Sequence, residues 1–390
     1  MDNYSLRFSG IRLELRPMSK EAHLLLTVLR RGTIDGDSDS VNWDELLLLA
    51  ESHGVFPAFC RSYSGELPGI FRDRLRSHWA ASAHLTSELD RLLELFARNG
   101  IETLPLKGPV LAQALYGSIS LRTCDDLDLL VKSTSFARAQ SVLIDAGFVP
   151  ADEVGNYHRG FVDKGVFVEL HFGVASPSLP RFELERAWAR SSTINFCGHD
   201  TSIFGKTDLL LYLVLHGVKH HFARLVWLLD VTLALATLDD DDVEQLLEMA
   251  RSTGIEGALL TTYALAHLVF GSKPPSKIGE AMTLNPSVFS QAALIADKML
   301  SGPAETGTPA HNASIFVSLE MGTRKRWAHR LRFLLPTQQD RLWTRQHGIP
   351  SIWMMYLRPF RLLFRYGPTV TLKTIFPGLG HRVHSGVRKV

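Results

Sequence analysis

The feature that most constrains the fold of this chain is a short apolar strand that carries acidic side chains. Residues 126–131 read Asp-Leu-Asp-Leu-Leu-Val, and the strand is predicted over Leu127–Val131. Side chains two positions apart in a strand point to the same face, so Asp126 and Asp128 are expected to lie together. Two neighbouring carboxylates repel each other, and burial increases the repulsion. A fold that keeps such a strand needs positive charge there, and a divalent cation supplies it.

The sequence around this strand alternates between β-compatible and helical segments. The segments that we expect are the strands Ile101–Leu106, Leu127–Val131, Phe161–Asp163 and Val166–His171 and the helices Val110–Tyr116 and Ser135–Ala146. Lys164 and Gly165 separate the last two strands, as in a hairpin. We therefore predict an α+β fold with a small mixed sheet and helices on one face.

Helical patterns dominate on both sides of this core. Further helices are expected at Thr207–Phe222, Leu225–Leu238 and Asp239–Met249. The chain is accordingly divided into four regions: an N-terminal helical region (1–98), the mixed core (99–205), a helical domain that closes a cleft (206–300), and a Gly/Pro-rich loop followed by a basic, aromatic, helical C-terminal region (301–390).

A third carboxylate, Glu169, belongs to the expected strand Val166–His171. If this strand lies beside Leu127–Val131, Glu169 can face Asp126 and Asp128. Three carboxylates can hold two divalent ions about 3.5–4 Å apart, the layout used for in-line phosphoryl transfer. The three acids are then both metal ligands and catalytic residues, with Mg²⁺ or Mn²⁺ as the ions, and Glu169 could take the proton of the acceptor.

A phosphate-binding turn is expected at Lys107 and Gly108, which follow a strand and open a helix. Glycine lets the backbone approach a phosphate, and free N–H groups at a helix start attract anions. Lys107 would add a point charge on the triphosphate, and Arg122 could make bidentate phosphate contacts. Either basic residue could instead neutralise the acids. Gly117 and Ser118 form a competing phosphate loop, but their spacing to Asp126 leaves little room for a helix.

Two histidines, His216 and His220, are four residues apart on one expected helical face. This spacing can bind zinc, but no glutamate follows the first histidine as in a zinc hydrolase. Both residues could also be structural. We expect Lys219 and His220 to reach the cleft and contact the triphosphate or the acceptor. Asp230 could orient a histidine, and His171 shares the strand face of Glu169.

In their order along the chain, these motifs resemble the uncharacterised nucleotidyltransferase family of the DNA-polymerase-β-like superfamily. The matching motifs, spread over roughly residues 80–370, are Leu106-Lys107-Gly108, Leu115-Tyr116, Arg122, Asp126-Leu127-Asp128-Leu129-Leu130-Val131, Glu169-Leu170-His171 and the block Leu209–Asp230. The chain departs from the family at Asp125, where relatives usually carry a small residue.

The resemblance implies a polymerase-β-type core that moves a nucleoside monophosphate from an NTP such as ATP to an acceptor. By position it assigns Asp126 and Asp128 to metal binding and Glu169 to the third carboxylate. The acceptor is left open among a peptide natural product, a saccharide, another small molecule, a protein and RNA. Relatives resemble accessory enzymes of biosynthetic pathways.

Two other classes of function fit parts of the same pattern. The core could hold a nucleotide without turnover, as a binding module or a component of a toxin–antitoxin pair. The Asp-x-Asp motif could also hold the metal of a sugar-nucleotide glycosyltransferase. In the plainest alternative, Asp125 and Asp126 cap a turn and Asp128 is an exposed strand residue. The intact set of three carboxylates and Lys107 favours the transferase.

The cysteines and the N-terminus indicate a cytoplasmic protein. Cys60, Cys124 and Cys197 lie far apart without a CxxC pair, which is typical of a reducing compartment. The first residues lack a signal-peptide pattern, and no apolar run reaches the roughly 18 residues of a membrane span.

Charge is distributed unevenly along the chain. Nine of the 42 Lys and Arg residues, but none of the 40 Asp and Glu residues, lie after position 340. The same segment holds aromatic residues, among them Trp353, Tyr356 and Tyr366. This basic tail suggests an anionic partner, either a membrane surface or RNA, or packing against the acidic body of the protein.

Overall fold

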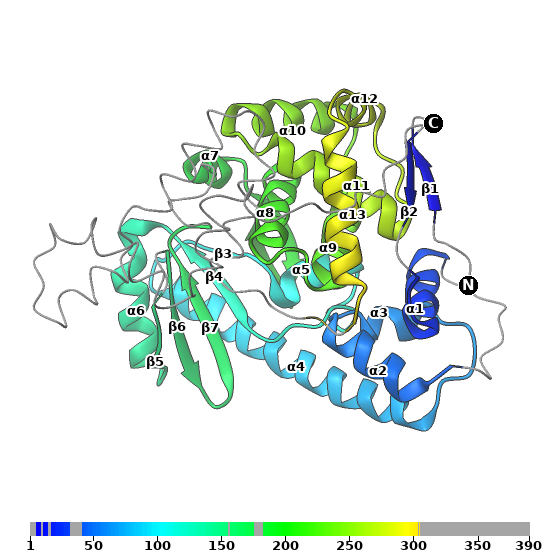
Figure 1. The fold of residues 1–390 in the computed structure, drawn as a ribbon. Helices are drawn as coiled ribbons and strands as arrows, with labels where there is room; N and C mark the ends of the chain where they lie inside the picture. The colour runs from blue at the N-terminus through cyan, green and yellow to red at the C-terminus, as the bar shows by residue number, and fades with distance from the viewer. Residues whose placement is uncertain are drawn as a thin grey trace, which may run out of the picture.

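The computed structural model describes residues 5–8, 11–14, 17–31, 41–154, 157–174, 182–302 and 304 (Figure 1). It combines a five-stranded mixed sheet with many helices, which confirms the predicted α+β class. The basic C-terminal tail and nearly all of the Gly/Pro-rich loop that begins region 301–390 lie outside the described residues. The contacts predicted for the tail, with a membrane surface, RNA or the acidic body of the protein, lie outside them too. The four-region division of the chain stays a prediction.

The five-stranded sheet has the order β3-β4-β7-β6-β5. Its strands are β3 (Thr103–Pro105), β4 (Leu127–Val131), β5 (Val149–Val154), β6 (His158–Asp163) and β7 (Val166–His171). β4 runs parallel to β7, and the other neighbours are antiparallel. The predicted position of Val166–His171 beside Leu127–Val131 is therefore confirmed.

One face of this sheet packs against the long helix α4 (Gly69–Arg98) and the shorter α6 (Phe136–Asp145). Leu127, Leu129 and Val131 of β4 join a core with Leu85–Phe96 side chains of α4 and with Leu143 of α6. Because side chains alternate along a strand, Asp128 and Leu130 point to the opposite face. Leu130 joins the second core there, which includes the apolar residues of helix α8 (Lys206–Lys219). The expectation of helices on one face is therefore wrong: helices cover both faces, and all five residues of β4 are buried.

The N-terminal region holds the helices α1 (Lys20–Arg31), α2 (Trp43–Ser52) and α3 (Phe56–Ser62) before α4. It also holds a hairpin of β1 (Ser5–Phe8) and β2 (Ile11–Glu14), which the sequence analysis did not predict. α4 begins near α2 and α3 and extends along the five-stranded sheet (Figure 1), so one helix joins these two parts.

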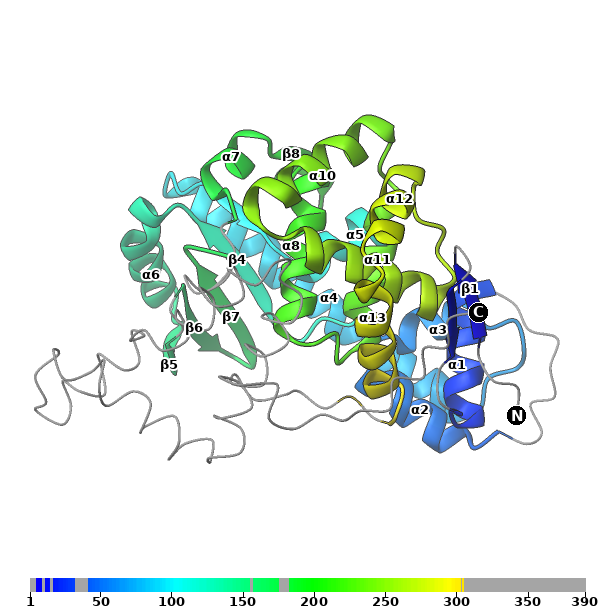
Figure 2. The same ribbon diagram turned by 45° about the horizontal axis from the view of Figure 1, so that its top comes forward.

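A helical half follows the sheet. After α7 (Leu184–Ala189) and the hairpin of β8 (Ser192–Phe196) and β9 (His199–Ile203), the chain forms α8, α9 (Leu225–Leu235), α10 (Asp240–Thr253), α11 (Glu256–Phe270), α12 (Ser276–Leu284) and α13 (Ser287–Met299). Nearly every residue of α11 is buried, and α11 packs on α8, α9 and α13. In both views α8 lies between the sheet and α11 (Figure 1 and Figure 2). The described helices include none that is long and apolar enough to cross a membrane.

Helix α8 ends at Lys219, three residues before the end that its apolar pattern predicts. The chain turns into the left-handed region at His221 (φ 58°) and Phe222 (φ 47°), a conformation that L-residues rarely adopt. The backbone N–H of Phe222 donates to the carbonyl of Gly217 over 2.7 Å, and the Phe222 ring lies against the Cα of Gly217. This turn fixes the position of Lys219 and His220, so Gly217 supports the segment that carries both residues.

We expect Gly217→Ala to lower the free energy of unfolding by about 1–3 kcal/mol, the usual cost of overpacking a filled core. An added methyl group would overlap the Phe222 ring, which is buried and 1% exposed, and protein cores are densely packed. Gly69→Ala is the matched control, because a methyl group there meets only the end of the Arg72 side chain, 3.9 Å away. Denaturant unfolding measures both variants, and equal stabilities would contradict the expectation.

Candidate active site

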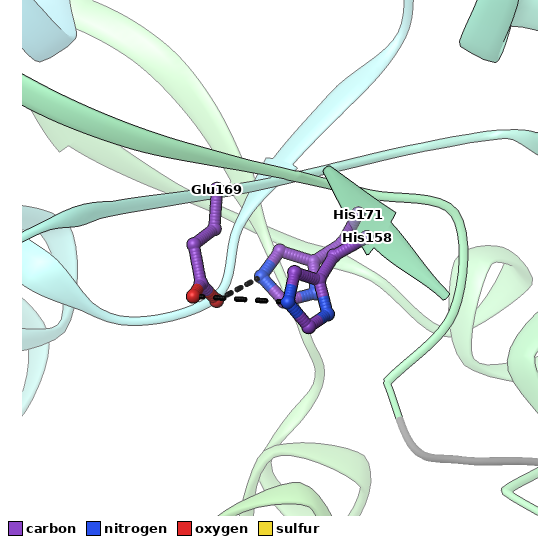
Figure 3. Close-up of side chains that lie close together, drawn as sticks. All are labelled: His158, Glu169 and His171. Atoms are coloured by element: carbon purple, nitrogen blue, oxygen red, sulfur yellow. Dashed lines mark ion pairs between the residues drawn. The ribbon is translucent and has the colours of Figure 1, made fainter. Parts of the chain in front are cut away.

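One face of the five-stranded sheet gathers polar side chains from three adjacent strands. Asp128 of β4 lies directly opposite Glu169 of β7 in the parallel register. His171 follows Glu169 by two positions and therefore shares its face. His158 of β6 lies opposite His171 in the antiparallel register. The register alone thus brings two carboxylates and two imidazoles together, as Figure 3 shows for Glu169, His158 and His171.

Three carboxylates form the acidic part of the site. Asp126, just before β4, joins Asp128 and Glu169, and one oxygen of each lies within 4.8 Å of the others. Burial, together with the charges of Asp128 and Glu169, raises the pKa of Asp126 to about 6. Among the described residues, none donates a hydrogen bond to the Asp126 side chain. The acids that the sequence analysis placed together are therefore together in space, at a distance that suits a shared metal ion.

Lys107 supplies positive charge to this group. Its Nζ lies 2.7 Å from Oδ2 of Asp128. Burial alone would lower the pKa of Lys107, but the adjacent carboxylates outweigh it and raise the pKa above its ordinary value. The backbone places this residue: the N–H of Leu106 donates to the carbonyl of Asp128, and Gly108 takes φ +70° at the start of α5 (Gly108–Tyr116). The Lys-Gly turn is thus held against the acidic strand.

His171 lies between two of the carboxylates. Its Nε2 is 2.9 Å from Oδ1 of Asp128 and 3.1 Å from Oε2 of Glu169. Burial alone would lower the pKa of His171, but these two hydrogen bonds raise it. Burial alone would raise the pKa of Asp128, yet Lys107 and His171 hold it well below its ordinary value. Asp128 is therefore ionised and compensated, whereas Asp126 is the carboxylate without a compensating contact.

A pocket of about 190 Å³ opens beside the acids. Besides the groups described above, it is lined by Cys124, Asp125, Tyr157, Tyr212, His216, Lys219, His220, Arg224 and Trp227, among others. Lys219 and His220, which the sequence analysis expected at the cleft, are among these lining residues, and so is His216. Burial, with the charge of Lys219, lowers the pKa of His220 to about 3, and burial also holds the pKa of His216 well below its ordinary value. Both imidazoles are neutral at physiological pH.

Arg122 and Asp230 form a buried ion pair behind this pocket. Nη2 and Nε of Arg122 lie 2.8 Å and 2.9 Å from the two oxygens of Asp230, and the Tyr116 hydroxyl donates to the same carboxylate over 2.7 Å. Arg122 also lines the pocket, whereas Asp230 is not among its lining residues. The expectation that Asp230 orients a histidine is wrong, because Arg122 and Tyr116 occupy both of its oxygens.

Several residues near the acids were not predicted as site residues by the sequence analysis, among them Tyr157, His158, Tyr212 and Arg224. His158 was within reach of sequence reasoning, because the turn at Lys164 and Gly165 fixes the hairpin register. Counting five residues back from Asp163 and five forward from Val166 pairs His158 with His171. Trp227, which packs against His216 and His220, belongs to the block Leu209–Asp230 that carries the family resemblance, but no role was predicted for it.

An acidic site on a mixed sheet, beside a Lys-Gly turn and under a helical cover, is the arrangement expected of the nucleotidyltransferase class. Residues 39–271, more than half of the chain, match the family described as uncharacterised nucleotidyltransferase. The chain belongs to this family. No curated protein matches it.

Three solved structures resemble the chain in part. The solution structure of the antibiotic-resistance factor ANT(2'')-Ia has 12% identity and a TM-score of 0.35, over 44% of this chain and 93% of that one. The crystal structure of ANT(2'')-Ia with adenylyl-2''-tobramycin has 12% identity and a TM-score of 0.34, over 43% and 97%. An antigenic nucleotidyltransferase-like protein from Paracoccidioides brasiliensis has 16% identity and a TM-score of 0.32, over 50% and 95%.

Proposed function

We propose that this enzyme transfers a nucleoside monophosphate from an NTP to an acceptor hydroxyl in a reaction that depends on Mg²⁺ or Mn²⁺, and releases pyrophosphate. The observation that carries the proposal is the convergence of Asp126, Asp128 and Glu169 at one pocket, beside Lys107. The proposed acceptor is a small molecule such as a peptide natural product or a saccharide, with a protein or RNA as further candidates.

The donor atoms of the acidic group fit hard divalent cations. All three side chains offer carboxylate oxygens, the ligand type that Mg²⁺ prefers. Asp126 supports the fit, because its pKa stays raised although the charge of Lys107 lowers it, so Lys107 offsets the negative charge only in part. We propose two ions, held by Asp126, Asp128 and Glu169. When bound, they would supply charge for the triphosphate and lower the pKa of the acceptor hydroxyl.

The other groups of the pocket receive complementary roles in this proposal. Lys107 and the start of α5 bind phosphate oxygens, because the Lys107 ammonium and the N–H groups near Gly108 both attract anions. Lys219 adds a second positive charge; its ammonium lies over the Tyr157 ring, 5.4 Å from the ring centre.

Glu169 is the group that takes the acceptor proton. Burial alone would raise the pKa of Glu169, but the hydrogen bond from His171 keeps it below its ordinary value. Glu169 is therefore ionised at neutral pH and able to accept a proton. The neutral imidazole of His220, at the pocket wall, serves as a hydrogen-bonding group toward the triphosphate or the acceptor.

The direct test is transfer of label from each of four NTPs carrying labelled α-phosphate. The protein is incubated with Mg²⁺ and either a cell lysate or a panel of purified saccharides, peptides and RNA. We expect a labelled acceptor, equimolar pyrophosphate, and loss of both when the metal is removed with EDTA. A mass shift of one AMP, GMP, CMP or UMP identifies the nucleotide. NTP binding without pyrophosphate release for any acceptor would instead establish a binding module, and tighter binding of UDP-sugars than of NTPs would indicate a glycosyltransferase.

A further inference from the structure

We propose that His158, His171 and Glu169 form a second cation site, selective for a transition-metal ion such as Zn²⁺ or Co²⁺, adjacent to the three-carboxylate site. The proposal concerns metal binding alone and does not depend on the transfer reaction. The two sites differ in ligand chemistry and share one residue, Glu169.

The sheet register builds the three ligands into one cluster. His158 and His171 are cross-strand partners on β6 and β7, and Glu169 stands two positions before His171 on the same strand face. In Figure 3 both imidazoles point toward the Glu169 carboxylate. Nε2 of His171 lies 3.1 Å from Oε2 of Glu169, and Nε2 of His158 lies 3.9 Å from Oε1. One ligand atom from each residue lies within 4.8 Å of the others.

These distances are close to those that a metal ion requires. Tetrahedral zinc with bonds of about 2.0–2.1 Å places neighbouring ligand atoms about 3.3 Å apart. The 3.1 Å separation already meets this value, and the 3.9 Å separation needs a side-chain movement of under an ångström.

The surroundings hold the two imidazoles in this orientation. The rings lie 5.1 Å apart, and the Tyr157 ring packs against both, at 4.8 Å from His158 and 6.0 Å from His171. Within the described residues, Nδ1 of each ring is buried and has no hydrogen-bond partner. The polar contacts of these rings are therefore directed at the carboxylates, where the ion would bind.

The ligand types determine which cation binds. Imidazole nitrogen suits Zn²⁺, Co²⁺ and related ions, whereas Mg²⁺ prefers oxygen ligands alone. Two imidazoles and one carboxylate thus favour a transition metal, while Asp126, Asp128 and Glu169 favour Mg²⁺. Because Glu169 belongs to both sets, an ion bound to the histidines changes the ligands left for the other site.

The test is titration of the full-length protein, free of a histidine tag and of Mg²⁺, with Co²⁺. Visible absorption detects tetrahedral Co²⁺ coordination, and calorimetry with Zn²⁺ measures affinity. We expect one Co²⁺ per chain and a loss of affinity of at least about tenfold in His158→Gln, since one of three ligands is removed. His220→Gln is the matched control, because it removes an imidazole from the other histidine pair and should leave Co²⁺ binding unchanged.

Two further variants keep the outcome clear. His158→Asp retains a ligand of harder character, so it should still bind an ion but shift preference from Co²⁺ toward Mn²⁺. Asp126→Asn should keep Co²⁺ binding even where it loses magnesium-dependent transfer, which separates this proposal from the proposed function. Absence of Co²⁺ binding, or binding that is unchanged in both His158 variants, would overturn it.

Discussion

Asp126→Asn is expected to lower the rate of nucleotidyl transfer by at least about 1000-fold, because loss of a metal-ligand charge removes several kcal/mol of transition-state stabilisation. The same substitution should leave the fold at least as stable as the wild type. This combination is the signature of a residue kept for chemistry at a cost in stability.

The stability side follows from the charges around Asp126. Its pKa is raised from 3.8 to about 6 by burial and by the neighbouring acids. The folded state therefore binds this proton more tightly than the unfolded state does, so its contribution favours folding below pH 4 and is lost as the pH rises toward 6. Above pH 6 the ionised carboxylate destabilises the metal-free protein by on the order of 3 kcal/mol. Asparagine removes that charge, so metal-free Asp126→Asn should unfold at higher denaturant concentration than the wild type at pH 7.

Two measurements decide the outcome. Addition of Mg²⁺ should stabilise the wild type and have a much smaller effect on Asp126→Asn, because binding to the folded state alone raises stability. Asp125→Asn is the matched control: this neighbouring carboxylate is 66% exposed and already pairs with Arg224, 3.0 Å away, so the variant should retain most of the transfer activity. Near-normal transfer by Asp126→Asn would remove the basis for the metal-site assignment.

Periodicity and local motifs were sufficient to predict the core elements. The predicted strands Leu127–Val131 and Val166–His171 have the predicted bounds, and their alternation determines which side chains share a face. Asp128 and Glu169 could be placed together only on the condition that the two strands are neighbours, and the structure meets this condition with a parallel register that sets the two acids opposite each other. The acidic part of the site was accordingly within reach of the sequence.

Other elements had no local signal strong enough to be recognised. The hairpin of β8 and β9 shows little alternation of apolar and polar residues. Only Phe196 and Thr201 of these two strands are buried, and Thr201 is polar. The end of α8 depends on the left-handed turn at His221 and Phe222, which the packing of Phe222 on Gly217 stabilises. Such tertiary contacts override the helical pattern that continues to Phe222.

The role of Arg122 shows the same limit. Its position four residues before Asp126 suggested a phosphate contact. The structure pairs it with Asp230, more than 100 residues later in the chain, and sequence spacing carries no information on such a pair. A basic residue near an acidic motif can therefore belong to the support of a site as well as to the site itself.

Asp230→Asn is expected to lower the free energy of unfolding by about 3–5 kcal/mol, the usual cost of leaving one member of a buried ion pair uncompensated. Arg122 and Asp230 are only 4% and 1% exposed, so water cannot replace the lost partner. The pair also links the loop before β4 to helix α9, and it is joined there by Tyr116 from the end of α5. The substitution should therefore loosen the segment that carries Asp126 as well as the helical cover.

The same experiment separates a supporting role of Arg122 from direct phosphate binding. Asp73→Asn breaks an ion pair of similar length, 2.9 Å to Arg76, but both partners are exposed, so it should change stability little. The double variant Arg122→Met with Asp230→Leu removes both buried charges and should recover much of the lost stability.

If Arg122 instead acts mainly on the triphosphate, Arg122→Met will raise KM for the NTP while unfolding at nearly the wild-type denaturant concentration. If Arg122 supports the site instead, Arg122→Met will lower the free energy of unfolding and leave KM for the NTP nearly unchanged. It will then reduce kcat, because Asp126 is displaced.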